Sequence, residues 1–226
     1  RAQDLITHTD GTSYMGGYKY ISTTGYGMVA SVDTNGSLLW ALYNTTASTG
    51  VAAVWYDPLN SRVIATGSTD SGSTGIVTVF NIDGVVIWQR TISRNDGQSI
   101  YMQSATADSS GNVYVSGFSG SPRKNFIVKY NSSGSVLWTR QLEVPGVYSY
   151  NDFGTVGTDS NGDVYLSFYW DYNNTDTPSA QGGGFAKFNS SGTLLFIRKV
   201  NNIVGALRIS VASDGTVSLL GGVNAK

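Results

Sequence analysis

Three features of this 226-residue sequence predict an all-β fold. Short apolar runs alternate with polar residues, and many of the 28 glycines stand where such runs end. No segment has a helical period long enough to compete with this pattern. The pattern also recurs along the chain with a period of about fifty residues, which is typical of a repeat architecture. Charged residues make up only 13% of the chain, which favours strands joined by tight polar turns.

Each of the first four repeats contains a β-hairpin with a glycine in its turn and an aromatic residue on its second strand. Glycine is expected in the turn because the backbone there needs a positive φ, which a side chain resists. The turn glycines are Gly36, Gly84, Gly134 and Gly192, and the aromatic residues are Trp40, Trp88, Trp138 and Phe196. We expect these rings to pack between repeats. Phe196 lacks an indole N–H, which favours packing over a specific hydrogen bond.

A second hairpin precedes each of these, and its clearest copy spans residues 105–117. Each repeat therefore supplies four strands, A to D in chain order, which is typical of a blade of a β-propeller. The sequence predicts one propeller domain or propeller fragment over residues 1–226, with repeats at about 1–46, 47–94, 95–144, 145–201 and 202–226. This gives four four-stranded antiparallel blades and the first two strands of a fifth. Because these ends do not complement each other, we expect a larger or partner-completed ring.

The segments Asp108-Ser-Ser-Gly-Asn-Val-Tyr-Val-Ser-Gly117 and Phe126-Ile-Val-Lys-Tyr-Asn-Ser-Ser-Gly-Ser-Val-Leu-Trp138 resemble the bacterial seven-bladed propeller repeats called SBBP. The Asp/Asn-x-x-Gly-x-x-x-Trp part is also similar to quinoprotein-type propeller repeats. The resemblance covers almost the whole chain and implies the propeller fold. It implies little about activity, because such repeats occur in surface, envelope and phage proteins of many functions.

Composition argues against several classes of partner and cofactor. The net charge is -1, so no basic field is present to collect nucleic acid. No apolar run approaches the roughly 20 residues of a membrane span, so no membrane insertion is expected. Cysteine is absent, which removes disulfides and thiolate metal ligands. No cofactor or metal is expected.

Two motifs with apparent chemistry have simpler interpretations. His8 is the only histidine, and no nucleophile elbow or phosphate-binding loop accompanies it, so we interpret it as an ordinary strand residue. Asp159-Ser-Asn-Gly-Asp163 places oxygen ligands as a calcium loop does. However, its twelfth position is Trp170, where a bidentate carboxylate is needed. Because the same turn recurs at Asp108, we expect side-chain capping of the turn instead.

The strongest functional signal is the departure of the fourth repeat from the pattern. Its B–C connection, at 168–184, is by far the longest, and the preceding D–A connection at 143–152 should open on the same propeller face. Aromatic rings beside carboxylates and amides suit a glycan, because C–H faces stack and hydroxyls find acceptors. The candidate ligand-binding residues are Tyr148, Tyr150, Asp152, Tyr169, Trp170, Asp171, Tyr172 and Asn173. The alternatives are an interface with a neighbouring subunit or no role at all.

We therefore expect a non-enzymatic interaction module of a phage tail or fibre, or of a bacterial surface adhesin, located on a virion or cell surface. Its partners would be other protein subunits, the remaining blades of the same protein, or a surface glycan bound as a receptor. Two alternatives stay open. One is a fragment of a propeller enzyme, either quinone-dependent or glycan-cleaving, with active residues outside this chain. The other is a purely structural virion or envelope scaffold.

Overall fold

The computed structural model describes residues 2–21, 24–43, 49–69, 72–120, 123–144, 154–171, 181–201 and 203–223. Within these ranges all regular secondary structure is β, in 18 strands. The described residues contain no helix that could span a membrane. The predicted all-β propeller fold is confirmed.

The strands form four antiparallel four-stranded sheets and one two-stranded sheet, each made of strands consecutive in the chain. The first blade holds β1 (Ala2–Thr7), β2 (Ser13–Ile21), β3 (Thr24–Val32) and β4 (Leu38–Tyr43). The second holds β5 (Thr49–Asp57), β6 (Arg62–Thr69), β7 (Thr74–Asn81) and β8 (Val86–Ser93). The third holds β9 (Ile100–Ala107), β10 (Val113–Ser119), β11 (Lys124–Tyr130) and β12 (Val136–Gln141). The fourth holds β13 (Val156–Thr158), β14 (Val164–Asp171), β15 (Gln181–Phe188) and β16 (Leu194–Asn201). The fifth is the hairpin of β17 (Ile203–Val211) and β18 (Val217–Val223), so the expected two surplus strands are present.

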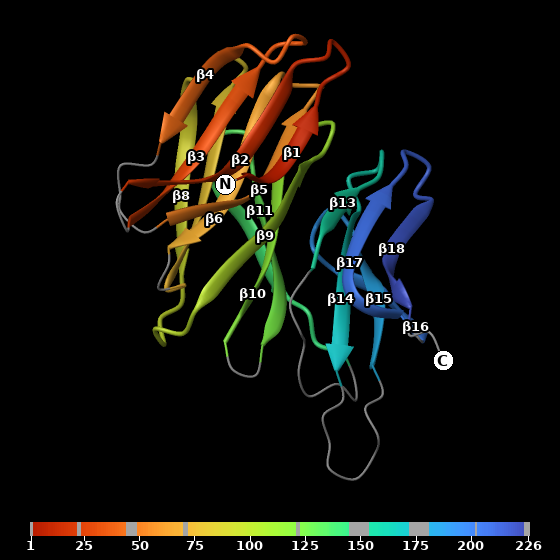
Figure 1. Ribbon diagram of the computed structural model, residues 1–226. Helices are drawn as coiled ribbons and strands as arrows, with labels where there is room; N and C mark the ends of the chain where they lie inside the picture. The colour runs from red at the N-terminus through yellow and green to blue at the C-terminus, as the bar shows by residue number, and fades with distance from the viewer. Residues whose placement is uncertain are drawn as a thin grey trace.

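The hydrophobic cores lie between neighbouring blades. One cluster joins the second blade to the third, for example through Val79 and Val128. Similar clusters join the first blade to the second and the third to the fourth. Figure 1 shows the result as a series of blades, with the first blade (red to orange) and the fifth (blue) at its two ends. The blades therefore stabilise one another by burying apolar faces that no single sheet could cover.

Each outer hairpin turn is built in the same way. An Asp or Asn side chain at the start of the turn accepts two backbone N–H bonds, as Asn131 does from Ser133 and Ser135 (3.1 and 2.8 Å). The glycine three residues later donates back to the Asn131 carbonyl (3.0 Å) and has a φ of 81°. The other three turns repeat this arrangement with φ between 81° and 84° at Gly36, Gly84 and Gly192.

The repeated tryptophan of each blade packs on the glycine turn of the next blade. A Cβ atom added at Gly84, Gly134 or Gly192 would lie only 2.8, 2.7 or 2.9 Å from the indole of Trp40, Trp88 or Trp138, respectively. This is the packing between repeats that was expected, seen for the three tryptophans but not for Phe196, and it explains why these turns also need a residue without a side chain.

The indole N–H of each tryptophan makes a specific hydrogen bond in this packing. The phenylalanine at the same position of the fourth repeat, Phe196, had suggested that no such bond exists. Trp40, Trp88 and Trp138 donate to the carbonyls of Ile82, Ser132 and Ser190 at 2.8, 3.0 and 3.1 Å. Each acceptor lies two residues before the turn glycine, so the register is the same at all three junctions. Phe196 differs because it stands in the fourth blade, and the described fifth blade has no outer hairpin to receive a donor.

A second set of contacts joins the inner turns of neighbouring blades. Arg62 Nη2 donates to the Gly111 carbonyl (3.0 Å). The Tyr114 hydroxyl donates to Asp108 Oδ2 (2.9 Å) and also lies 3.2 Å from the Gly162 carbonyl of the next blade. Burial, together with the adjacent Asp108 carboxylate, raises the pKa of Tyr114, so its hydroxyl keeps the proton that it donates.

The Asp159 turn is capped as predicted. Its Oδ1 accepts from the backbone N–H groups of Asn161 and Asp163 (3.0 and 3.1 Å), and its Oδ2 accepts from the Tyr165 hydroxyl and from Lys187. Asp108 makes the corresponding turn bonds to Ser110 and Asn112. These carboxylates are therefore occupied by turn amides and neighbouring side chains.

We predict that Trp88→Phe lowers the free energy of unfolding by about 1–2 kcal/mol, because it removes the bond to the Ser132 carbonyl while keeping a ring over Gly134. Phe196→Leu should cost less than Trp88→Leu, since no described turn covers Phe196. Urea denaturation of the purified variants measures both differences. Wild-type stability in Trp88→Phe would contradict a contribution from the indole N–H.

Candidate functional site

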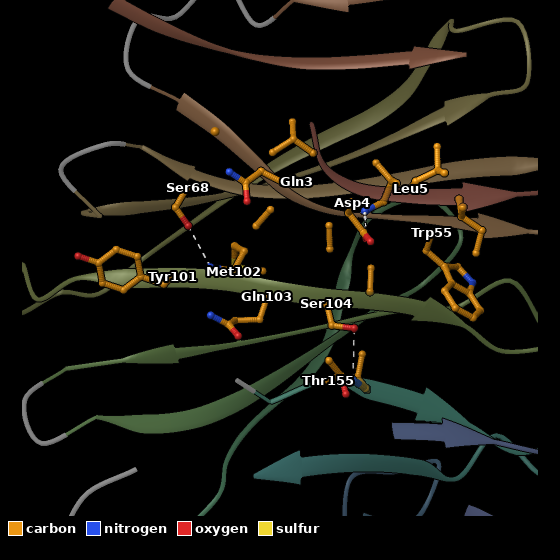
Figure 2. A pocket seen from close by; sticks show the side chains of 18 of the residues that line it. Gln3, Asp4, Leu5, Trp55, Ser68, Tyr101, Met102, Gln103, Ser104 and Thr155 are labelled. Carbon is orange, nitrogen blue, oxygen red and sulfur yellow. Dashed lines mark hydrogen bonds between the residues drawn. The ribbon is translucent and has the colours of Figure 1, made fainter. Parts of the chain in front are cut away.

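A cavity of about 780 Å³ lies along the inner strands of the propeller. Residues from all five blades line it, mainly from β1, β5, β9, β13 and β17. The first strand of each blade faces this space because the other strands of the sheet lie progressively further out. We call this space the channel. Figure 2 shows ten of its residues labelled, with side chains converging from the separate blades.

Side chains of one blade satisfy inner-strand N–H groups of the next. The Asp4 carboxylate accepts from Val54 N (3.0 Å), the Ser68 hydroxyl from Met102 N (2.9 Å) and the Thr155 hydroxyl from Ile209 N (2.8 Å). Ser104 does the same for Val156 N at a longer 3.4 Å. An innermost strand has one edge without a partner strand, so these side chains take the place of a ladder. Three of the four bonds are drawn in Figure 2.

A different group of polar side chains in the channel carries no such bond. Gln3 from β1, Gln103 from β9 and Arg208 from β17 line the cavity without a hydrogen bond or ion pair to any other described residue. Gln3 and Arg208 are exposed, and Gln103 is half-buried. Figure 2 shows the two glutamines among the side chains that line the channel, on opposite sides of the strand that carries Met102 in this view. These groups are available to a ligand.

Aromatic and apolar surface accompanies these polar groups. Tyr101 stacks on Phe118 with ring centroids 4.8 Å apart, yet 37% of its surface stays exposed. Trp55 is half-buried, and Leu5 is 59% exposed. All of these residues line the channel. Flat rings, amides and a guanidinium therefore share one cavity.

The described lining of the channel holds few side chains that could act as an acid or a base. Asp4 is the one carboxylate among the described lining residues, and it already accepts the Val54 N–H. A glycosidase of the usual kind needs two carboxyl groups flanking the scissile bond. The described residues do not place such a pair in the channel. They also contain no group of three or more His, Asp or Glu side chains arranged to hold a metal ion.

The loop site predicted from the sequence lies largely outside the described residues. Tyr148, Tyr150, Asp152, Tyr172 and Asn173 all fall there. The backbones of Trp170 and Asp171 end β14, but nothing is described of their side chains. Tyr169 lies on the same strand and is 8% exposed. That prediction therefore stays a prediction.

His8 lies just after β1 and not within a strand. Its Nδ1 is 2.9 Å from Asp10 Oδ1, and its ring lies against Tyr56 with centroids 4.3 Å apart. Asp10 also caps the turn by accepting a hydrogen bond from Thr12 N (2.8 Å). These contacts give His8 a place in the first inner turn, outside the channel lining.

Sequence reasoning missed Gln3, Gln103 and Arg208. They belong to separate repeats and stand about one hundred residues apart, and none stands in a recognisable motif. The usable signal was their position, because a polar residue on a first strand of a propeller blade can face the central space.

A family model described as outer membrane protein assembly factor BamB matches residues 7–167. The match spans the first three blades and the start of the fourth. This chain belongs to the BamB family. This confirms the expectation that the chain belongs to a family of propeller-repeat proteins, whereas the resemblance to the SBBP repeats in particular stays a prediction. No curated protein sequence matches the chain.

Several solved structures share the architecture of this BamB-family chain. An α-L-arabinanase from Penicillium chrysogenum, complexed with arabinobiose, gives a TM-score of 0.65 at 10% identity, over 98% of this chain and 75% of that one. The polysaccharide lyase Uly1 gives 0.60 at 11% identity, over 98% and 66%. An exo-β-1,3-galactanase from Clostridium thermocellum gives 0.54 at 10% identity, over 96% and 52%. At these identities the likeness shows the fold alone.

One sequence-based expectation is corrected by these structures. The chain was expected not to be an enzyme, because its repeats carry no catalytic motif. Its structural neighbours are mostly glycoside hydrolases, with a polysaccharide lyase among them, so this architecture is one on which such enzymes are built. The repeated residues are those that hold the blades together. They do not indicate whether single residues from different blades form a catalytic site.

We predict that Asp4→Ala lowers the free energy of unfolding by about 1–3 kcal/mol, because it leaves the buried Val54 N–H without an acceptor. Gln3→Ala, at the preceding residue on β1, should leave stability within about 0.5 kcal/mol of wild type. Urea unfolding measures both. Equal stability of the two variants would show that Asp4 does not support the junction between the first two blades.

Proposed function

We propose that this BamB-family propeller is a carbohydrate-active protein that binds an oligosaccharide in its channel. The observation that carries the proposal is the set of unpaired polar side chains from three blades, Gln3, Gln103 and Arg208, in one cavity with exposed aromatic surface. A polyhydroxylated ligand can use all of these groups.

The chemistry of the lining matches a sugar chain. Each glutamine amide offers one acceptor and two donors, which suits hydroxyl groups that both donate and accept. The accessible part of Tyr101 offers a flat face to the C–H side of a pyranose or furanose ring. Since ligand pockets in proteins commonly measure about 300–1,000 Å³, the channel has room for a short oligosaccharide.

Charge narrows the class of sugar. Arg208 is the cationic group among the described lining residues, and its guanidinium can bind a carboxylate through two parallel hydrogen bonds. The Asp4 carboxyl group, in the adjoining part of the lining, already accepts a hydrogen bond from the Val54 N–H. An oligosaccharide that carries a uronic acid is therefore the favoured ligand.

The wider setting belongs to the same proposal. A sugar-binding propeller of this repeat type, close to the SBBP repeats, fits a phage tail or fibre or a bacterial surface protein, where glycans are presented. The partners there would be a surface glycan and neighbouring subunits. The connections predicted from the sequence at 143–152 and 168–184, with candidate residues such as Tyr148 and Trp170, are proposed to add to this binding surface.

We predict that the wild-type chain binds uronate-containing oligosaccharides, and that Arg208→Ala weakens this binding by about tenfold or more, since a charge-assisted bidentate contact is lost. Gln103→Ala should weaken uronate-containing and neutral oligosaccharides alike. A glycan array followed by calorimetric titration measures both effects. The matched control is Ser210→Ala on the same strand, which should bind as wild type does. Unchanged affinity in Arg208→Ala and Gln103→Ala would overturn the channel as the site.

A parallel assay asks whether binding leads to cleavage. Acidic and neutral polysaccharides are incubated with the chain, and release of reducing ends or of unsaturated products is followed. Reducing ends without unsaturation would indicate hydrolysis, and unsaturated products would indicate elimination. Loss of either activity in Arg208→Ala would place catalysis at the channel.

A further inference from the structure

A second cavity, of about 250 Å³, opens between the first and second blades. Residues of β3 and β4 line it on one side, and residues of β5, β6, β7 and β8 line it on the other. Both sheets have all four strands, so the space lies between two complete sheet faces. We call this space the cleft.

The cleft exists because side chains that are large at the next junction are small here. In the third blade Met102 and Phe126 stand on one cross-strand row, through a glycine of the second strand, and are buried against the second blade. In the second blade the equivalent row carries Val51 and Ile76, which stay half-buried. Since protein interiors normally leave few voids larger than a water molecule, this loss of volume leaves an open site.

The neighbouring row adds a polar pair to one wall of the cleft. It carries Ala65 and Thr78 where the third blade has the buried residues Val115 and Val128. Thr78 is buried, and its hydroxyl oxygen accepts from Gln89 Nε2 at 3.0 Å. The Thr78 hydroxyl proton and the Gln89 side-chain oxygen have no hydrogen bond to a described residue. One donor and one acceptor therefore stand together on an otherwise apolar wall.

The opposite wall has lost a charge. Leu42 stands where Arg90 and Arg140 stand in the next two blades, as the strand pairings show. Those arginines donate through Nε to the turn-glycine carbonyl of the following blade, at 2.8 and 2.7 Å. Of the cleft-lining residues that the structure describes, none is charged. An ion would lose its hydration there without gaining a partner, so a neutral ligand is favoured.

We propose that the cleft binds a neutral monocyclic aromatic molecule that carries one hydroxyl group. Because the walls are two sheet faces, the open space between them suits a flat ring. Phe80 lines the cleft and can pack against such a ring edge to face. The ligand hydroxyl would accept from Thr78 and donate to the Gln89 oxygen. An apolar cavity of about 150 Å³ is enough to bind benzene, so the cleft has room for a ring with a short substituent.

The cleft adjoins the channel but differs from it in chemistry. Gly50 and Val51 line both cavities. The channel offers Arg208 and Asp4 as charged groups, whereas the described lining of the cleft is neutral. A sugar needs partners for many hydroxyl groups, and the polar pair can serve only one. The proposal therefore does not rest on sugar binding in the channel.

The test titrates the isotope-labelled full chain with benzyl alcohol, toluene, cyclohexylmethanol and benzoate, followed by NMR. We expect saturable binding of benzyl alcohol with shifts of the Ala65 and Ile76 methyl signals. Benzoate should bind at least about tenfold more weakly, since its charge finds no partner. Cyclohexylmethanol should also bind more weakly, because its puckered ring is thicker than the flat ring of benzyl alcohol.

Two variants examine the site with residues that the fold already accepts elsewhere. Thr78→Val introduces the residue found at the equivalent position of the third blade. It should weaken benzyl alcohol binding by about three- to tenfold, the effect of one hydrogen bond, and leave toluene binding unchanged. Ala65→Val/Ile76→Phe gives the cleft the third blade's larger side chains and should abolish binding of both. Circular dichroism and urea unfolding establish that each variant is folded.

The matched control is Thr139→Ala, since Thr139 is exposed and holds the position of Gln89 in the third blade. It should bind benzyl alcohol as the wild type does. Four outcomes would overturn the proposal: no binding of benzyl alcohol, equal binding of benzoate or cyclohexylmethanol, equal weakening of toluene and benzyl alcohol in Thr78→Val, or methyl shifts confined to the channel. Sugar binding is measured with the channel variants, so failure of either proposal leaves the other standing.

Discussion

The contact between a tryptophan and the glycine turn of the next blade is the interaction on which the rest of this propeller depends. It combines apolar burial of an indole, a hydrogen bond to a carbonyl two residues before the glycine, and steric need for a residue without a Cβ. Because all three must be met together, the contact fixes the relative position of two sheets that share no backbone ladder. The buried clusters between blades and the side chains that cap inner-strand N–H groups both require that fixed position.

Much of this architecture could be predicted from the sequence because its determinants are local and repeated. Gly134 and Trp138 stand at a constant separation in a hairpin, and neighbouring copies show the same pair. The role of the indole N–H could not be read in this way, since its acceptor lies about forty or fifty residues further along and only the register between blades brings it near. Phe196 looked like a tolerant substitution, but the structure places it where no turn is docked.

The channel escaped sequence analysis for a related physical reason. Gln3, Gln103 and Arg208 come from the first, third and fifth blades, and each is an ordinary polar residue in its own strand. Their common property is that they face one space, which depends on the curvature of the whole series. The candidate residues in the loops were easier to notice because a long insertion interrupts the repeat. A local irregularity is visible in a sequence, whereas convergence from distant strands is visible only in the fold.

The tryptophan contact also has a direction, since each of the first three blades gives a ring to the blade that follows it in the chain. Such head-to-tail interfaces use two different surfaces and place no limit on the number of units that they join. A duplicated segment coding for one blade would arrive with both surfaces already matched to its new neighbours. Propellers of this kind can therefore gain or lose blades during evolution without a new type of interface. The number of blades in a closed ring then depends on the angle between neighbouring sheets.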